Sequence, residues 1–310
     1  MTEYPKKHHF VPQFLLRRFA DAGNRLVVHR IADERQFATK VTDIGHRNLG
    51  HSIYRPGREP DHHSMEAWMA QLEGDAATAI EELAKRRDRS VPDEARIALA
   101  WLMALQWQRS QFLKHLIGNE MGKSTSEVDG QLFQTVLMSA LNAYVLSPWS
   151  LRDEEHCRPK DQWNFLVSVL LSGAMHWSCY RPRAGGLIVG DNVPCFSGYA
   201  DTPPPGIPPA WLDHGVGVGP AEFRRVTFPL GTDMVVIISR DPRDAARLSA
   251  SDINRFTVFN SREFVAHSPS WPTDHPRLAA DLRDHLGTQR LVSPVFLQDY
   301  APGGRAARKG

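Results

Sequence analysis

Hydrophobic residues in the middle of the chain recur at the spacing that is typical of helices. From residue 64 to about residue 87 the spacing predicts an amphipathic helix, with apolar positions at Trp68, Leu72, Ala76, Ile80 and Leu83. A second helix is predicted from Pro92 to about residue 117, because proline and acidic residues favour a first helical turn. Its middle is apolar on nearly every side, which indicates a buried position. Further helices are predicted over 125–145 and 161–174.

Short segments rich in β-branched and apolar residues flank this helical centre. Residues 25–31 and 36–42 predict a β-hairpin near the N-terminus. Residues 175–182 and 185–191 predict two strands around a Gly-Gly turn, and residues 223–230 and 233–240 predict a further strand pair. Residues 241–266 predict one or two short helices. We therefore expect an α+β fold, mainly helical in its centre, with small antiparallel β elements near both ends.

No linker divides the chain into two independent cores, so we predict a single domain over residues 1–290. Residues 201–222 hold too many prolines and glycines for regular structure, and they predict a long surface loop. The Gly- and Arg-rich end, residues 291–310, predicts a partly disordered C-terminal tail.

The composition narrows the class of protein only slightly. Lysine and arginine number 37 against 35 aspartates and glutamates, which gives a formal net charge of +2. Nucleic acid stays open as a partner but is not indicated by this charge. No apolar run reaches the roughly 18–20 residues that span a bilayer, and the N-terminus lacks the apolar region of a secretory signal. Three distant cysteines without a CxxC pair indicate reduced thiols, so we predict a cytoplasmic protein with no membrane partner.

The most unusual stretch of the sequence is KKHHFVPQFLLRRFAD, at residues 6–21. Pro12 suits the first turn of a helix, on which Gln13 and Arg17 share one face. His8 and His9 precede it in extended backbone, where neighbouring side chains point to opposite sides. The two imidazoles are therefore not expected to bind one metal ion from a regular strand. Three alternatives stay open: they hold the N-terminus to the core by hydrogen bonds, one of them acts as a metal ligand or as an acid or base, or they are exposed on the surface.

Three further pairs of polar residues are candidates for a site. Glu66 and Glu73 are seven positions apart and lie on one face of the predicted helix, about 10 Å apart. Glu66 can instead complement the positive end of that helix, which makes Glu73 the stronger candidate.

The other two pairs are Gln106 with Arg109 and Asp191 with Asn192. Arg109 stands in the most apolar helix, so it needs a partner, either a carboxylate such as Glu73 or Asp191 or an anionic ligand. Asp191 and Asn192 follow a buried strand, where a scaffold can hold functional groups rigidly, although the same residues are common in turns.

Other histidines lie in the loop between the hairpin and the first long helix, namely His46, His51, His62 and His63. Their spacing matches no recognised motif for a metal site, such as two histidines four apart on a helix. We therefore do not assign them to the site. The sequence also lacks a Walker loop, a GxGxxG motif and a GxSxG motif, which argues against nucleotide-cofactor redox chemistry and serine hydrolysis.

The order of these segments resembles the bacterial family defined by domain of unknown function 4238. That family opens with a His-His-x-x-Pro-Gln-x-x-Leu-x-x-Phe signature, which stands here as His8, His9, Pro12, Gln13, Leu16 and Phe19. Its spaced glutamates match Glu66 and Glu73, and its Gln-x-x-Arg helix matches Gln106 and Arg109. The family's Ser-Asp-Asn-Pro turn differs here, because the chain has GDNVP at residues 190–194. The resemblance covers about residues 6–269 and implies a fold without an established activity.

Two hypotheses about function follow from these residues. The first is a hydrolase, nuclease-like or defence-associated, that acts on a phosphoester or another anionic substrate with the help of a divalent metal. Its expected catalytic residues are His9, Glu73 and Asp191. Its expected substrate-binding residues are Gln13, Arg17, Gln106, Arg109 and Asn192. Its expected metal ligands are His8, His9 and Asp191. The second hypothesis is a non-catalytic ligand-binding or protein-interaction module, in which the same polar residues form a structural network.

Overall fold

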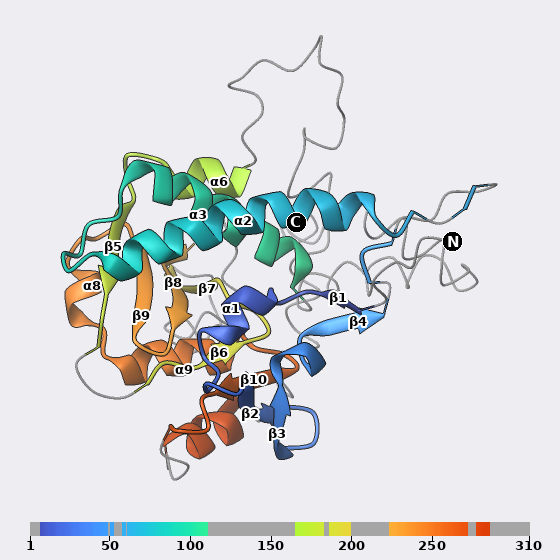
Figure 1. The fold of residues 1–310 in the computed structure, drawn as a ribbon. Coiled ribbons are helices and arrows are strands. Elements are labelled where there is room, and N and C mark those ends of the chain that lie inside the picture. Colours follow the sequence, from blue (N-terminus) through green and yellow to red (C-terminus); the bar gives the residue numbers. More distant parts are fainter. Residues whose placement is uncertain are drawn as a thin grey trace, which may run out of the picture.

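The computed structural model describes residues 7–48, 50–52, 58–59, 61–110, 165–182, 186–199, 223–271 and 277–285. In this part of the chain, long helices lie along one side of the molecule and sheets lie beneath them (Figure 1). The predicted helix at 125–145, the predicted loop at 201–222 and the predicted tail at 291–310 lie outside the described residues.

The larger part of the core is built around a four-stranded antiparallel sheet. Its strands follow the order β5 (His176–Tyr180), β9 (Met234–Ser239), β8 (Phe223–Gly231) and β7 (Cys195–Tyr199). Every residue of β9 is buried, as expected for a strand that is covered on both faces. The predicted pairing of residues 223–230 with residues 233–240 is confirmed by the β8–β9 register.

Helices cover both faces of this sheet. In β7 the ring of Phe196 contacts Trp107 of α3 (Asp93–Arg109), with their centroids 5.1 Å apart. The adjacent Cys195 lies against Thr257 of α9 (Ala250–Asn260), on the opposite face. A short helix, α8 (Asp244–Arg247), packs on β9. The sheet is therefore the middle layer of three.

Two long helices form the upper layer in Figure 1. They are α2 (Ser64–Lys85) and α3, which pack against each other, and α3 also contacts α6 (Phe165–Leu170). The helices predicted from residues 64 and 92 are therefore confirmed, and the short α6 lies within the helix predicted at 161–174. In the part of the chain that the structure describes, no helix meets the length and hydrophobicity needed to cross a membrane.

A second four-stranded sheet joins the two ends of the described chain. Its order is β3 (Gln36–Lys40), β2 (Arg25–Arg30), β10 (Phe264–His267) and β6 (Val189–Gly190), with every pair antiparallel. The predicted N-terminal hairpin is confirmed by the β2–β3 register. The predicted pairing of residues 175–182 with residues 185–191 is wrong, because β5 pairs with β9 and β6 pairs with β10.

A small two-stranded sheet holds the opening motif in place. Strand β1 (Lys7–His9) pairs with β4 (His46–Asn48), so that His9 lies opposite His46. The single turn η1 (Val41–Asp43) precedes β4, and helix α1 (Gln13–Arg17) follows β1. Gly45, with a φ of 68°, accepts hydrogen bonds from the backbone nitrogens of Phe10 and Val11. The backbone of the opening motif is thus bound to the β4 segment before α1 begins.

The expected mainly helical centre is wrong. The described residues form three antiparallel sheets with ten strands, and the strands run through the interior rather than only near the ends. The strands were underestimated for physical reasons. β1, β4 and β6 have two or three residues each, and β10 continues directly from the helical pattern of α9. Their stability comes from partners that are distant in the sequence, which a local pattern does not reveal.

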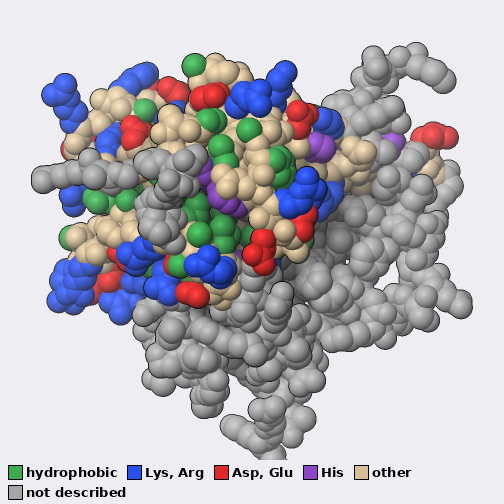
Figure 2. All heavy atoms as spheres, turned by 90° about the horizontal axis from the view of Figure 1, so that it is seen from below, with side chains coloured by type: hydrophobic (Ala, Val, Ile, Leu, Met, Phe, Trp, Pro, Cys, Tyr) green, Lys and Arg blue, Asp and Glu red, His purple; other side chains and the backbone are tan. Residues whose placement is uncertain are grey.

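Charged side chains of both signs share the lower face of the molecule. Figure 2 shows acidic side chains lying among the basic ones on this face, with hydrophobic side chains exposed between them. This mixture agrees with the near balance of charges in the sequence.

Gly190 is required by close packing at the end of β6. A Cβ atom at this position would lie 1.9 Å from Ser261 Oγ and 3.3 Å from Thr257 Cγ2 of α9. We predict that Gly190→Ala lowers the free energy of unfolding by about 1–3 kcal/mol, measured by urea denaturation. Adding Ser261→Ala removes the closest contact, so the double variant should lose less stability than the sum of the two single variants. Strict additivity would contradict this explanation.

Candidate functional site

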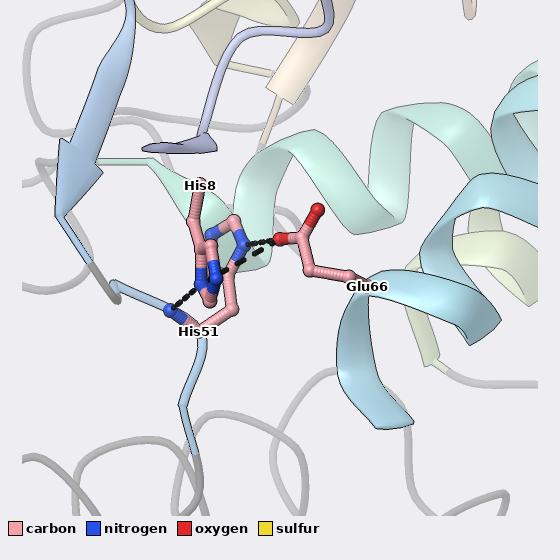
Figure 3. Close-up of side chains that lie close together, drawn as sticks. All are labelled: His8, His51 and Glu66. Atoms are coloured by element: carbon pink, nitrogen blue, oxygen red, sulfur yellow. Dashed lines mark hydrogen bonds and ion pairs between the residues drawn. The ribbon is translucent and has the colours of Figure 1, made fainter. Parts of the chain in front are cut away.

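The most concentrated group of potential ligands joins His8, His51 and Glu66. One ligand atom from each residue can be chosen so that all three lie within 4.8 Å of one another. His51 Nδ1 lies 2.5 Å from Glu66 Oε1, and His8 Nδ1 lies 3.8 Å from the same oxygen. The two imidazole rings stack with their centroids 5.5 Å apart, and Glu66 points toward them from the side (Figure 3).

Three different elements bring these side chains together. His8 lies in β1, His51 follows β4 by three residues, and Glu66 lies in the first turn of α2. The backbone nitrogen of His51 donates to His8 Nδ1 at 2.9 Å, which holds the two rings against each other. Both rings are buried, whereas the Glu66 side chain is 31% exposed. The cluster is therefore reached from the Glu66 side.

This donor set can hold a transition metal. Two imidazoles and one carboxylate form the ligand set of several catalytic zinc sites, which leave a fourth position for water or substrate. The same donors also suit iron, since imidazole and carboxylate ligands bind several divalent metals. Without an ion, the short contact is explained by an Nδ1–H group of His51 that donates to Glu66. The geometry thus allows either a metal site or a charge-assisted hydrogen bond.

Two more histidines lie in the segment before α2. Ser52 Oγ lies 2.7 Å from His62 Nδ1, and Asp61 Oδ1 accepts from the backbone nitrogen of His63 at 3.0 Å. Ser52 is fully buried next to His51 in the sequence. The Ser52–His62 contact holds the segment before α2 close to the segment after β4.

His9 lies apart from the cluster, in contact with a different group of residues. Its Nδ1 atom is 3.4 Å from Gln13 Nε2, and its ring is 5.4 Å from that of His46. Gln13 Oε1 in turn accepts from Arg17 Nη2 at 2.8 Å. Burial, followed by the neighbouring His46, lowers the pKa of His9 to about 4. The ring is therefore neutral at pH 7.

Arg109 is the centre of a second polar group. It is almost completely buried, and its Nη2 donates to Glu73 Oε1 at 2.6 Å while its Nη1 donates to the backbone oxygen of His9 at 2.9 Å. The amide of Gln106, oriented to satisfy both of its polar atoms, donates to Phe10 O at 3.0 Å and accepts from Arg109 at 2.5 Å. Of the two carboxylates expected as partners of Arg109, Glu73 is the one that binds it.

Asp191 and Asn192 belong to neither group. Asp191 Oδ1 accepts hydrogen bonds from the backbone nitrogens of residues 262, 263 and 264 at 2.8–3.3 Å. Asn192 Nδ2 donates to the backbone oxygen of Asn260 at 3.3 Å. Complete burial raises the pKa of Asp191, even though these hydrogen bonds favour its charged form. Their observed contacts hold the connection between α9 and β10.

The structure therefore divides the predicted site residues into three places. His8 lies in the candidate metal cluster, while His9, Gln13, Arg17, Glu73, Gln106 and Arg109 form one connected network of hydrogen bonds. Asp191 and Asn192 lie at the α9–β10 connection.

The sequence reasoning missed His51 and undervalued Glu66. His51 follows no metal-binding spacing, and it approaches His8 because β1 and β4 are paired. The alternating directions of the side chains in β1 could have indicated a second polar group near His8. If His9 faces the side of Gln13, His8 must face the other side and needs a polar partner there.

The fold and the site define an α+β protein with a cluster of two buried histidines and one partly exposed glutamate, and with a separate network around a buried arginine. The family model of the protein of unknown function DUF4238 matches residues 7–270. The chain therefore belongs to the DUF4238 family, and the resemblance noted in its sequence is confirmed. No curated protein and no solved structure matches the chain.

Replacing Arg109 tests its role in positioning the site. We predict that Arg109→Ala lowers the free energy of unfolding by about 2–4 kcal/mol, because Glu73, Gln106 and the His9 carbonyl lose a shared donor. Chemical denaturation measures the change. Arg17→Ala is the matched control, because Arg17 is exposed, and its effect should stay within about 0.5 kcal/mol. Equal effects of the two substitutions would contradict a structural role for Arg109.

Proposed function

We propose that this protein is a metal-dependent hydrolase of a phosphoester or another anionic substrate. The observation that carries the proposal is the convergence of His8, His51 and Glu66, whose ligand atoms lie within 4.8 Å of one another. A bound zinc or similar ion would polarise the substrate and lower the pKa of a coordinated water. Three protein ligands leave room for that water, which supports a catalytic rather than a purely structural site.

The residues of this chain would divide the work as follows. His8 and His51 offer imidazole nitrogens from a rigid, buried position, and Glu66 offers a carboxylate from the accessible side. Because His8 Nδ1 accepts a hydrogen bond from the backbone nitrogen of His51, His8 would bind the ion through Nε2 or after this hydrogen bond is given up. Glu66 lies in the first turn of α2, where the helix end favours a negative charge. Glu66 is thus a metal ligand in this proposal, rather than the catalytic Glu73 of the first hypothesis.

Arg109 has little capacity left for a substrate. Its two terminal nitrogens already bind Glu73, Gln106 and the His9 carbonyl inside the protein. Arg17 is a better candidate for contact with an anion, because it is exposed and uses one nitrogen to bind Gln13. Gln13 binds Arg17 and lies 3.4 Å from His9 Nδ1, so Arg17 belongs to the His9 side of β1 and would contact a part of the substrate away from the ion.

A second candidate function is a non-catalytic ligand-binding or protein-interaction module. The observation that favours it is the internal pairing of the predicted catalytic groups. Arg109 is buried and paired, and Asp191 binds backbone nitrogens that do not belong to the connected network. Under this alternative, the short His51–Glu66 contact is a hydrogen bond that holds the loop before α2.

Metal binding decides between the two candidates. We predict that the purified protein binds about one equivalent of Zn²⁺, Mn²⁺ or Fe²⁺ in calorimetry, and that EDTA lowers the melting temperature of the loaded protein. His51→Ala and Glu66→Gln should each weaken binding by about 10–100-fold or more, as expected when a ligand is lost. His176→Ala replaces an exposed histidine on β5 and should leave binding unchanged.

Glu66→Gln is the more informative of the two variants, because its side chain is partly exposed and the substitution keeps its size. If this variant folds normally and binds metal as well as the unchanged protein, the metal site is refuted.

Hydrolysis is tested separately with bis(p-nitrophenyl) phosphate as the probe. We predict metal-dependent release of nitrophenolate that is lost in Glu66→Gln, and a rise in KM with little change in kcat for Arg17→Ala. Metal binding without hydrolysis of phosphodiesters or phosphomonoesters would favour the ligand-binding candidate.

A further inference from the structure

The outer strand of the second sheet has a free edge. Strand β3 pairs with β2 on one side, and among the described residues no strand pairs with its other side (Figure 1). Four of its five residues are exposed, and the fifth, Thr39, is partly buried. The opposite edge of this sheet is β6, whose two residues offer little backbone for pairing. β3 is therefore the edge to which a further strand can be added.

Two backbone hydrogen bonds determine which groups of β3 face β2. The nitrogen of Arg30 donates to the oxygen of Arg35 at 2.8 Å, and the nitrogen of Val41 donates to the oxygen of Asn24 at 3.0 Å. In an antiparallel pair, successive residues turn their backbone groups alternately toward and away from the neighbouring strand. The odd-numbered residues of β3 therefore bind β2, and the even-numbered residues direct their N–H and C=O groups outward.

We propose that two copies of this chain pair through β3, antiparallel and about a twofold axis at Ala38, so that their second sheets join into one sheet. The outward groups of β3 are evenly spaced about Ala38, because Gln36 and Lys40 lie two residues to either side. Ala38 then lies opposite Ala38 of the second copy, and Gln36 lies opposite Lys40 of the second copy. Each of these pairs exchanges two backbone hydrogen bonds, and the contact is the same for both copies.

The apolar side chain on this edge favours the same arrangement. Phe37 is 39% exposed and is one of two exposed large hydrophobic residues among those that the structure describes. In the symmetric pair it lies opposite Thr39 of the second copy and diagonal to Phe37 of the second copy, within reach of both. Pairing therefore removes two phenyl rings from water.

The charges at the two ends of β3 are complementary between copies. Glu34 precedes the strand and Lys40 is its last residue. Antiparallel pairing brings Lys40 of one copy toward Glu34 of the other, whereas parallel pairing would bring like charges together. Arg35 belongs to the alternate side of the strand, together with Phe37. The middle of β3 also lacks the features that protect an edge, since it has no proline, no charge and no bulge.

Sedimentation equilibrium of the full chain tests this proposal. We expect a reversible dimer at protein concentrations of about 10–100 µM, because the contact is small. Ala38→Pro removes an outward N–H group and leaves the hydrogen bonds to β2 in place, so it should weaken dimerisation at least tenfold. EDTA should leave the dimer unchanged, because β3 contains none of the candidate metal ligands.

A pair of charge variants tests the position of the twofold axis. Ala38→Glu and Ala38→Lys each place like charges opposite each other, so each should weaken dimerisation about threefold or more. Mixed in equal amounts, the two variants should form a heterodimer that is tighter than either homodimer. Ala38 is exposed, so the melting temperature of the monomer should stay the same. Ala84→Glu and Ala84→Lys, at an exposed position of α2, are the matched controls and should not affect dimerisation.

Two results would overturn the proposal. One is a chain that stays monomeric at the highest concentration that remains in solution. The other is a dimer that persists in Ala38→Pro and shows no preference for the mixed pair of charge variants, because a different surface would then hold the copies together. Neither result depends on whether the candidate metal site binds an ion.

Discussion

The buried guanidinium of Arg109 connects the three elements on which the candidate site depends. It binds the backbone oxygen of His9 in β1, the carboxylate of Glu73 in α2 and the amide of Gln106 in α3. His8 precedes His9 in β1, and Glu66 lies two helical turns before Glu73 on the same face of α2. One cation therefore sets the distance between β1 and α2, and with it the distance between His8 and Glu66. A lysine at this position could not make three such contacts, because it lacks the planar fork of arginine.

The long helices and two of the strand pairs could be predicted from the sequence because their signals are local. The helical spacing of apolar residues from Trp68 to Leu83 predicted α2, and the β-branched and apolar segments around residue 30 predicted the β2–β3 hairpin. The remaining sheet order depends on pairing between distant segments. Strand β10 resembles the end of a helix in its sequence, yet it lies between β2 and β6. No local pattern contains that information.

The candidate site was predictable to a similar extent. The need of Arg109 for a buried partner followed from its apolar surroundings, and the opposed directions of neighbouring side chains in a strand followed from backbone geometry. The importance of His51 could not be predicted from the sequence, because its approach to His8 is produced by the β1–β4 pairing and by one backbone hydrogen bond. Asp191 was selected for its position after a buried strand, but its carboxylate is used by three backbone nitrogens at the start of β10.

The position of β10 in the second sheet also has a consequence for biosynthesis. His29 and His267 are 238 residues apart, and the strands that carry them are direct neighbours. When β2 and β3 leave the ribosome, the edge of β2 that β10 will cover has no partner until nearly the whole chain has been made. Closing such a long loop slows folding, and an unpaired strand edge can associate with other chains in the meantime. The nascent N-terminal hairpin is therefore a segment that benefits from protection by chaperones during synthesis.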